Sequence, residues 1–167
     1  HRTAEGWRIA LRRVVPVMRK QGHGRIVFCS SILGLLPQKL RGAYNASKHA
    51  IEGLMLTMRM ELWGSGIDVS LIEPGAIESK IAINAADYAD KYLDTQNSPH
   101  KESYDKRLAL LRSGGIKDPT KLGPDAVYAV LRHALDSRSP RPHYLVTKPA
   151  KIGAFLKRVL PSKMFYS

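Results

Sequence analysis

The sequence predicts an α/β protein built on a doubly wound parallel sheet, and three observations lead to that fold class. Stretches with the apolar spacing of helices alternate along the chain with short strand-like stretches. Residues 25–30 are nearly continuously apolar, as a strand is when helices cover both faces of a parallel sheet. The chain has 167 residues, 44% of them hydrophobic, which suits one globular domain. Helix-to-strand alternation then implies right-handed crossovers, with ligands at the carboxyl ends of the strands.

The first half of the chain contains two predicted helices and two predicted strands. The first helix spans residues 5–21, with Pro16 as an interior fault, and glycines close it before strand 25–30. The second helix covers residues 42–63 and is stopped by Gly64 and Gly66, after which strand 67–73 follows. The first helix carries an apolar stripe made of Trp7, Leu11, Val14, Val15 and Met18.

The second half begins with a polar, broken segment. Residues 76–122 predict two modest helices, 83–94 and 101–112, with mobile connections at 96–100 and 113–122. A helix with proline in its first turn then starts after Gly123, and a short strand is expected at 143–147. Residues 148–167 form a basic, amphipathic C-terminal extension.

Ser31, Tyr44 and Lys48 are the residues that most strongly suggest chemistry. A phenol has an unperturbed pKa of about 10, so it is a poor acid or base near neutral pH without help. A lysine four residues further along a helix lies on the same face and favours the phenolate, which allows proton exchange with a carbonyl or alcohol oxygen. A serine hydroxyl can hold that oxygen. The hydride of such a reaction must come from a cofactor, because no side chain can supply it.

The Tyr-x-x-x-Lys spacing is not informative alone, because the chain contains it twice. Tyr144 and Lys148 repeat the spacing, but Tyr144 falls in the predicted strand, where positions four apart are separated by about 13 Å. Tyr44 and Lys48 instead begin a segment with helical periodicity. Only the first pair is predicted to share a helix face.

Together these residues resemble the catalytic motif of the short-chain dehydrogenase/reductase family. Ser31 ends a buried strand, Tyr44 follows thirteen positions later, and the next strand ends in Pro74-Gly75, as in that family. The run Pro74-Gly75-Ala-Ile-Glu-Ser79 is similar to the family's Pro-Gly-x-x-x-Thr. The resemblance covers roughly residues 3–147 and looks closest to hydroxysteroid- or retinol-type members.

The resemblance implies an NAD- or NADP-dependent oxidoreductase acting on a carbonyl or alcohol. It gives Tyr44 the role of general acid/base, Ser31 that of holding the substrate oxygen, and Lys48 that of favouring the phenolate and binding the nicotinamide ribose. Cofactor contacts are further implied for Tyr44, Pro74, Gly75, Ile77 and Ser79, with residues 76–122 capping the substrate. A homodimer or homotetramer is implied through helices 5–21 and 42–63, with the stripe Trp7, Leu11 and Val14 partly at the interface.

Two departures from the family pattern qualify the resemblance. No Gly-x-x-x-Gly-x-Gly turn occurs in the sequence, and the strands that bind the adenosine and pyrophosphate have no counterpart before His1. Residues 1–147 are therefore predicted to be the C-terminal part of a Rossmann-like domain that lacks its N-terminal strands. In addition, Thr3 stands where the family has a catalytic asparagine.

Charge supports a rival hypothesis. The chain carries 27 Lys and Arg against 14 Asp and Glu, a net +13, but its few aromatics are not interleaved with basic residues, so nucleic acid is not an expected partner. The basic extension 148–167 instead suggests weak contact with an anionic membrane. The alternative function is thus a non-catalytic scaffold that acts as a binding or peripheral-membrane module.

The remaining features of the sequence concern metal binding, the single cysteine and the cellular location. The six histidines are scattered, so no metal site is predicted. Cys29, the single cysteine, is expected to be a small buried hydrophobic residue rather than a reactive thiol. With no signal segment and no apolar run long enough to span a membrane, a cytoplasmic location is expected.

Overall fold

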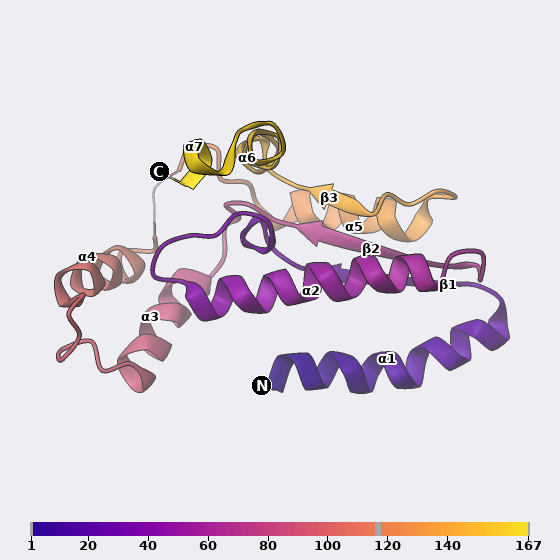
Figure 1. Ribbon diagram of the computed structural model, residues 1–167, viewed down its shortest axis with the longest axis horizontal. Helices are drawn as coiled ribbons and strands as arrows, with labels where there is room; N and C mark the ends of the chain where they lie inside the picture. Colours follow the sequence, from indigo (N-terminus) through magenta and orange to yellow (C-terminus); the bar gives the residue numbers. More distant parts are fainter. Residues whose placement is uncertain (1, 116–117, 167) are drawn as a thin grey trace. The chain divides into compact units, whose positions relative to one another are not determined.

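A computed structural model describes residues 2–115 and 118–166 (Figure 1). The chain forms two units. Residues up to Gly75, together with those from Asp125 onward, form the first, and Ala76–Pro124 form the second.

The first unit is organised by a parallel three-stranded sheet, which confirms the predicted fold class. Its strands are β1 (Gly24–Cys29), β2 (Ile67–Glu73) and β3 (His143–Leu145), in the spatial order β1-β2-β3. Val69 of β2 is paired with Ile26 of β1, and Leu71 with His143 of β3. The central strand β2 is buried along most of its length, as expected of a strand with a neighbour on each side.

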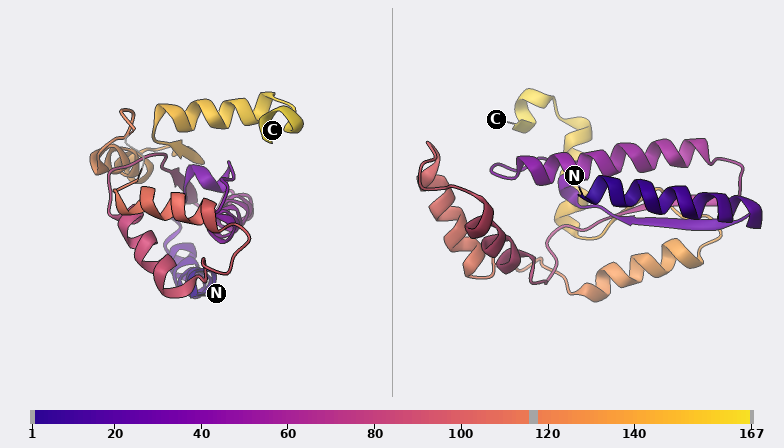
Figure 2. Two further views of the ribbon diagram at one scale, coloured as in Figure 1. Left: turned by 90° about the vertical axis from the view of Figure 1, so that its left-hand side faces the viewer. Right: turned by 90° about the horizontal axis from the view of Figure 1, so that it is seen from below.

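Helices cover both faces of this sheet (Figure 2). Helices α1 (Arg2–Gln21) and α2 (Gly42–Glu61) lie on one face, and α5 (Pro124–Asp136) lies on the other. Because successive residues of a strand point to opposite faces, Val69 and Leu71 pack under α2, whereas Ile72 packs with α5. The buried residues on the α1 and α2 side are Ile26, Ile51, Met55, Leu62, Ile67, Val69 and Leu71.

Pro16 does not interrupt α1, which runs continuously across it. The stripe predicted for this helix divides between the core and the surface. Trp7 meets Phe28 of β1 edge-on, with ring centroids 6.0 Å apart, and Leu11 also packs against the core. Val14 is exposed.

The expectation that Cys29 is buried was wrong, because its side chain is exposed. Cys29 is the last residue of β1, and β1 is an edge strand of the described sheet. The burial of β1 is accordingly incomplete, and it ends in an exposed position. The apolar composition of the strand did not reveal its edge position.

The second unit contains the helices α3 (Ile81–Tyr92) and α4 (Lys101–Arg112). A parallel bridge joins Ile77 to Leu122, and Arg112 of α4 donates to the Asp90 carboxylate of α3 at 2.8 Å. Helix α3 begins and ends two residues earlier than predicted, whereas α4 has the predicted bounds.

The C-terminal segment forms α6 (Lys148–Val159) and α7 (Ser162–Tyr166). Thr147 caps α6, since its hydroxyl oxygen accepts from the Ala150 N–H at 3.3 Å. Helix α6 lies against the loop after β1. Lys157 donates to the Leu35 carbonyl, and a Cβ added to Gly153 would lie 2.7 Å from a Leu36 methyl carbon.

Candidate active site

Ser31 lies in a loop that backbone hydrogen bonds fasten to the end of β2. The N–H of Ser30 donates to the Ile72 carbonyl at 2.8 Å, and the N–H of Ile32 donates to the Pro74 carbonyl at 3.0 Å. Ser31 is therefore held beside the Pro74-Gly75 segment, at the carboxyl ends of two parallel strands. Ligands bind at such positions in open α/β sheets.

The Ser31 side chain begins the short 3-10 helix η1 (Ile32–Gly34). Its oxygen accepts a hydrogen bond from the Leu33 N–H at 3.2 Å. A serine hydroxyl carries one donor proton beside its acceptor lone pairs, so this cap leaves the proton available for an oxygen of a substrate.

Tyr44 and Lys48 lie in the first two turns of α2, as their spacing predicts. The Lys48 ammonium lies 5.7 Å from the centroid of the Tyr44 ring, a cation–π arrangement. The same ammonium donates to the carbonyl of Cys29 at 3.1 Å. Lys48 thus links the tyrosine to the end of β1, two residues before Ser31, while two of its three N–H donors remain.

The Pro-Gly segment requires its glycine. A Cβ on Gly75 would lie 2.1 Å from the Thr147 hydroxyl oxygen and 3.3 Å from the Ala150 Cβ, so the backbone after β2 passes tightly against the start of α6. Ile77 and Ser79 belong to the second unit. The Ser79 hydroxyl oxygen accepts from the Ile81 N–H at 3.4 Å, near the start of α3.

The second Tyr-x-x-x-Lys pair has a structural role. Tyr144 lies in β3, is 5% exposed and packs against α5. Its hydroxyl is hydrogen-bonded to His133 at 2.9 Å and accepts from the Arg141 N–H at 3.0 Å. Lys148 is exposed at the start of α6. The side chain of Thr3, which aligns with the family asparagine, lies outside the described residues.

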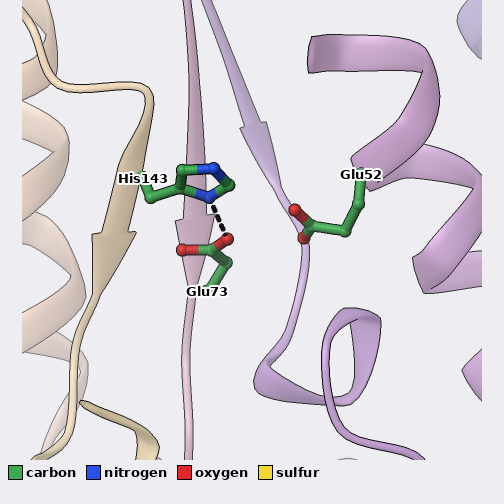
Figure 3. Close-up of side chains that lie close together, drawn as sticks. All are labelled: Glu52, Glu73 and His143. Carbon is green, nitrogen blue, oxygen red and sulfur yellow. Dashed lines mark hydrogen bonds and ion pairs between the residues drawn. The ribbon is translucent and has the colours of Figure 1, made fainter. Parts of the chain in front are cut away.

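Three further ionisable side chains, which sequence reasoning did not select, lie together beside the end of β2 (Figure 3). They are Glu52 of α2, Glu73 at the last position of β2, and His143 at the first position of β3. His143 Nδ1 is 2.6 Å from a carboxylate oxygen of Glu73, and Glu73 is completely buried. The sequence did offer one signal, because Glu73 is a charged residue at the end of an apolar strand. Nothing in the sequence indicated that Glu52 lies beside it.

Burial dominates the electrostatics of this group. It raises the pKa of Glu52 to about 7, an effect that the nearby Ser30 hydroxyl opposes and the Glu73 carboxyl reinforces. The hydrogen bond to Glu73 raises the pKa of His143, although partial burial of the imidazole acts in the opposite direction.

Comparisons with known proteins establish the family. The sequence model of the short chain dehydrogenases matches residues 4–89. The uncharacterized oxidoreductase YbbO of Escherichia coli is 40% identical over 152 residues, which cover 91% of this chain and 50% of the relative. NADPH-dependent 3-dehydrocapnine reductase of Ornithobacterium rhinotracheale is 28% identical over 142 residues, which cover 85% of this chain and 48% of that enzyme. The chain belongs to the short-chain dehydrogenase/reductase family.

A solved structure agrees with this assignment. The crystal structure of a short chain dehydrogenase/reductase from Burkholderia phymatum in complex with NAD matches with a TM-score of 0.63 at 27% identity. The match covers 89% of this chain and 51% of that protein. The chain spans about half the length of the curated relatives it matches. Within the described residues, no helix is both long enough and apolar enough to cross a membrane.

The residues at this site fit one end of a nicotinamide dinucleotide. The start of α2 supplies the phenol of Tyr44 and the ammonium of Lys48, which has two remaining donors. The segments after β1 and β2 supply the Ser31 hydroxyl and Gly75, which has no room for a side chain. These groups suit a ribose and a nicotinamide ring. The glycine-rich turn that cradles the pyrophosphate in dinucleotide-binding folds does not occur in this sequence.

Proposed function

We propose that this chain carries the catalytic half of an NAD(P)-dependent oxidoreductase that interconverts a carbonyl compound and an alcohol. The observation that carries the proposal is the position of the Lys48 ammonium, which lies at the Tyr44 ring and also donates to the strand end that leads into Ser31. Bound NAD(H) or NADP(H) supplies or accepts the hydride.

Each residue of this centre has a role that its contacts suit. Tyr44 donates the proton that a carbonyl oxygen gains on reduction, and takes it back in the reverse reaction. The Ser31 hydroxyl donates to the same oxygen, because its own oxygen is already engaged with the Leu33 N–H. Lys48 supplies positive charge beside the phenol and binds the ribose with its remaining donors. The Pro74-Gly75 backbone lies against the nicotinamide, and from the motif alone we extend these cofactor contacts to Ile77 and Ser79.

The substrate class we propose is a sizeable apolar alcohol or ketone of the hydroxysteroid or retinol type, capped by residues 76–122. The second unit exposes many apolar side chains for its size, which suits an apolar ligand. They include Ile81, Ile83, Tyr88, Tyr92 and Leu93, and the rings of Tyr88 and Tyr92 stack with centroids 5.8 Å apart.

We further propose that the protein pairs with itself through α1 and α2, as a homodimer or homotetramer. The outward surface of this helix pair exposes large apolar side chains, including Val14 and Val17 of α1, Leu54 and Met60 of α2, and Trp63, which is 83% exposed. Trp7 and Leu11 pack against the chain's own core and contribute less to such an interface than their sequence pattern suggests.

The test is a nicotinamide assay on the purified chain. Binding of NADH and NADPH is followed by fluorescence, and oxidation of the reduced cofactor is followed by absorbance with a panel of aldehydes, ketones, retinal and steroids. We expect saturable binding of one cofactor and its oxidation with at least one apolar carbonyl compound. Neither binding nor oxidation with any member of the panel would count against the proposal.

One observation favours a second candidate, a scaffold that attaches to anionic membranes through α6. The helix contacts the rest of the chain through Ala150, Gly153 and Lys157, so its opposite face is turned to solvent. That opposite face is apolar, and basic side chains flank it. The exposed apolar residues are Ile152, Phe155, Leu156 and Val159, and the exposed basic residues are Lys148, Lys151 and Arg158.

Replacing Val159 by aspartate should weaken binding to vesicles that contain phosphatidylserine by about tenfold, because it removes apolar contact and places a negative charge at an anionic surface. Leu135→Asp on α5 is the matched control, since Val159 is 54% exposed and Leu135 is 46% exposed. Co-sedimentation with vesicles at low and high salt measures both. Equal loss in the two variants, or binding that salt leaves unchanged, would argue against α6 as the membrane surface.

A further inference from the structure

The cluster of Glu52, Glu73 and His143 contains several buried acceptor atoms without a hydrogen-bond partner among the described residues. Glu52 is 5% exposed and Glu73 is 0% exposed. Both carboxylate oxygens of Glu52 and one of Glu73 are buried and lack a hydrogen-bond partner among the described residues. Buried polar atoms of native proteins nearly always have partners, so three unpartnered oxygens in one place suggest a ligand.

The three side chains converge from different elements on one point (Figure 3). The Glu52 carboxylate extends from α2 toward the space beside Glu73 and His143. One donor atom from each residue lies within 4.8 Å of the other two. The register of the sheet explains the pairing of Glu73 with His143, since Leu71 is opposite His143 and alternate residues of β2 share a face.

A shared proton is the alternative to a cation in this cluster. One proton between Glu52 and Glu73 gives partners to two of the three oxygens, as its donor and its acceptor, and the Ser30 hydroxyl beside Glu52 is a donor for the third. The imidazole of His143 is already engaged with the other oxygen of Glu73. A cation that replaces the proton between His143 and Glu73 can accept lone pairs from all three side chains at once, and it also offsets two buried negative charges, which are costly without compensation.

We propose that Glu52, Glu73 and His143 form a binding site for a divalent transition-metal ion, with Zn²⁺ as the best-matched ion. One imidazole nitrogen and two carboxylates are a ligand set that Zn²⁺ accepts, whereas Mg²⁺ and Ca²⁺ favour sets made of oxygen alone. The 36% exposed side chain of His143 gives an ion access to carboxylates that are otherwise enclosed. Ser30, whose buried hydroxyl oxygen also lacks a partner, lies at the Glu52 side of the cluster.

This site is distinct from the proposed proton-transfer centre but is built on the same elements. Glu52 is one helical turn beyond Lys48 on α2, and Glu73 immediately precedes Pro74. A bound ion therefore ties α2 to the end of β2. Its role is structural, because it adds a cross-link between two elements that otherwise meet through apolar packing and the hydrogen bond from Arg59 to the Val69 carbonyl.

The experiment is a calorimetric titration of the metal-free protein with Zn²⁺, paired with thermal unfolding in the presence and absence of the ion. We expect one strong site, and a midpoint of unfolding that rises by about 5–10 °C at a Zn²⁺ concentration one hundredfold above its dissociation constant. Glu52→Gln, which keeps the shape of the side chain, should weaken that site at least about tenfold and remove the thermal shift. Mg²⁺ should produce neither effect.

His100→Gln is the matched control, because His100 is an exposed histidine that is not a member of the cluster, and the substitution should leave the strong site intact. Glu73→Gln provides a second variant, so the test does not depend on whether Glu52→Gln folds.

The proposal is overturned if Zn²⁺ shows no saturable binding, or if binding survives both glutamine substitutions in the cluster. It is also overturned if Glu52→Gln raises the unfolding midpoint while Zn²⁺ has no effect on the wild type, since a protonated carboxyl would then explain the cluster. None of these measurements requires turnover, so they are independent of the proposed oxidoreductase activity.

Discussion

Replacement of Tyr44 by phenylalanine is expected to lower the turnover of carbonyl reduction by a factor of about 10²–10⁴, the usual contribution of a positioned general acid. The substitution removes only a hydroxyl from a half-buried ring at the start of α2, so the fold and the contact of the ring with the Lys48 ammonium should remain. Steady-state kinetics with the best substrate of the carbonyl panel measure the change.

Tyr144→Phe is the matched control, since it removes the same group from the other Tyr-x-x-x-Lys pair. Turnover should persist there, while the free energy of unfolding should fall by about 1–3 kcal/mol, because the hydroxyl is buried and has two hydrogen-bond partners. Denaturant unfolding measures that loss. Full turnover in Tyr44→Phe would remove Tyr44 from the mechanism.

The second large effect is expected on stability, at Gly66 between α2 and β2. Gly66 has a φ of +77°, and an added Cβ would lie 2.0 Å from the backbone oxygen of Gly22. Gly66→Ala must therefore displace the backbone. This displacement should weaken or break the hydrogen bond from the Gly24 N–H to the Gly66 carbonyl, which is 3.1 Å long. We expect a loss of about 3 kcal/mol or more in the free energy of unfolding, measured in urea.

Gly64 allows the steric clash to be separated from backbone strain. It has nearly the same dihedral angle, +78°, but nothing lies within 4 Å of an added Cβ. Gly64→Ala should therefore cost only the left-handed conformation of alanine, about 1 kcal/mol. Similar losses in the two variants would show that the close approach of Gly66 to Gly22 does not constrain the fold.

The sequence was sufficient for the sheet because local patterns determine it. Strand β2 has the predicted bounds, β1 differs by one residue at each end, and the parallel arrangement follows from the helices between the strands. Lys48 could be placed beside Tyr44 because a helix fixes the relation of residues four apart. The setting of the second Tyr-x-x-x-Lys pair was predictable for the same reason, since a strand separates such residues.

Features that depend on distant segments could not be predicted. Glu52 and Glu73 are 21 positions apart and His143 lies a further 70 away, so only the register of the sheet and the packing of α2 bring them together. The exposure of Cys29 depends on whether another strand lies beside β1, which the composition of β1 does not encode. The roles of Ser31, Tyr44 and Lys48 in turnover remain predictions.

The two backbone hydrogen bonds that fasten the Ser31 loop to β2 also determine which movements the proposed site tolerates. Ser31 is held by β2, whereas Tyr44 and Lys48 belong to α2. A slide of the helix along the sheet would leave both of those bonds intact, but it would break the hydrogen bonds from Lys48 to the Cys29 carbonyl and from Arg59 to the Val69 carbonyl. The alignment of serine with tyrosine is therefore set by these two polar contacts together with the packing of Ile51 and Met55 in the core cluster. A small change in the volume of Ile51 or Met55 should shift Tyr44 relative to Ser31, and it should therefore alter turnover before it unfolds the protein. The apolar core thus affects the geometry of the proposed site as well as the stability of the fold.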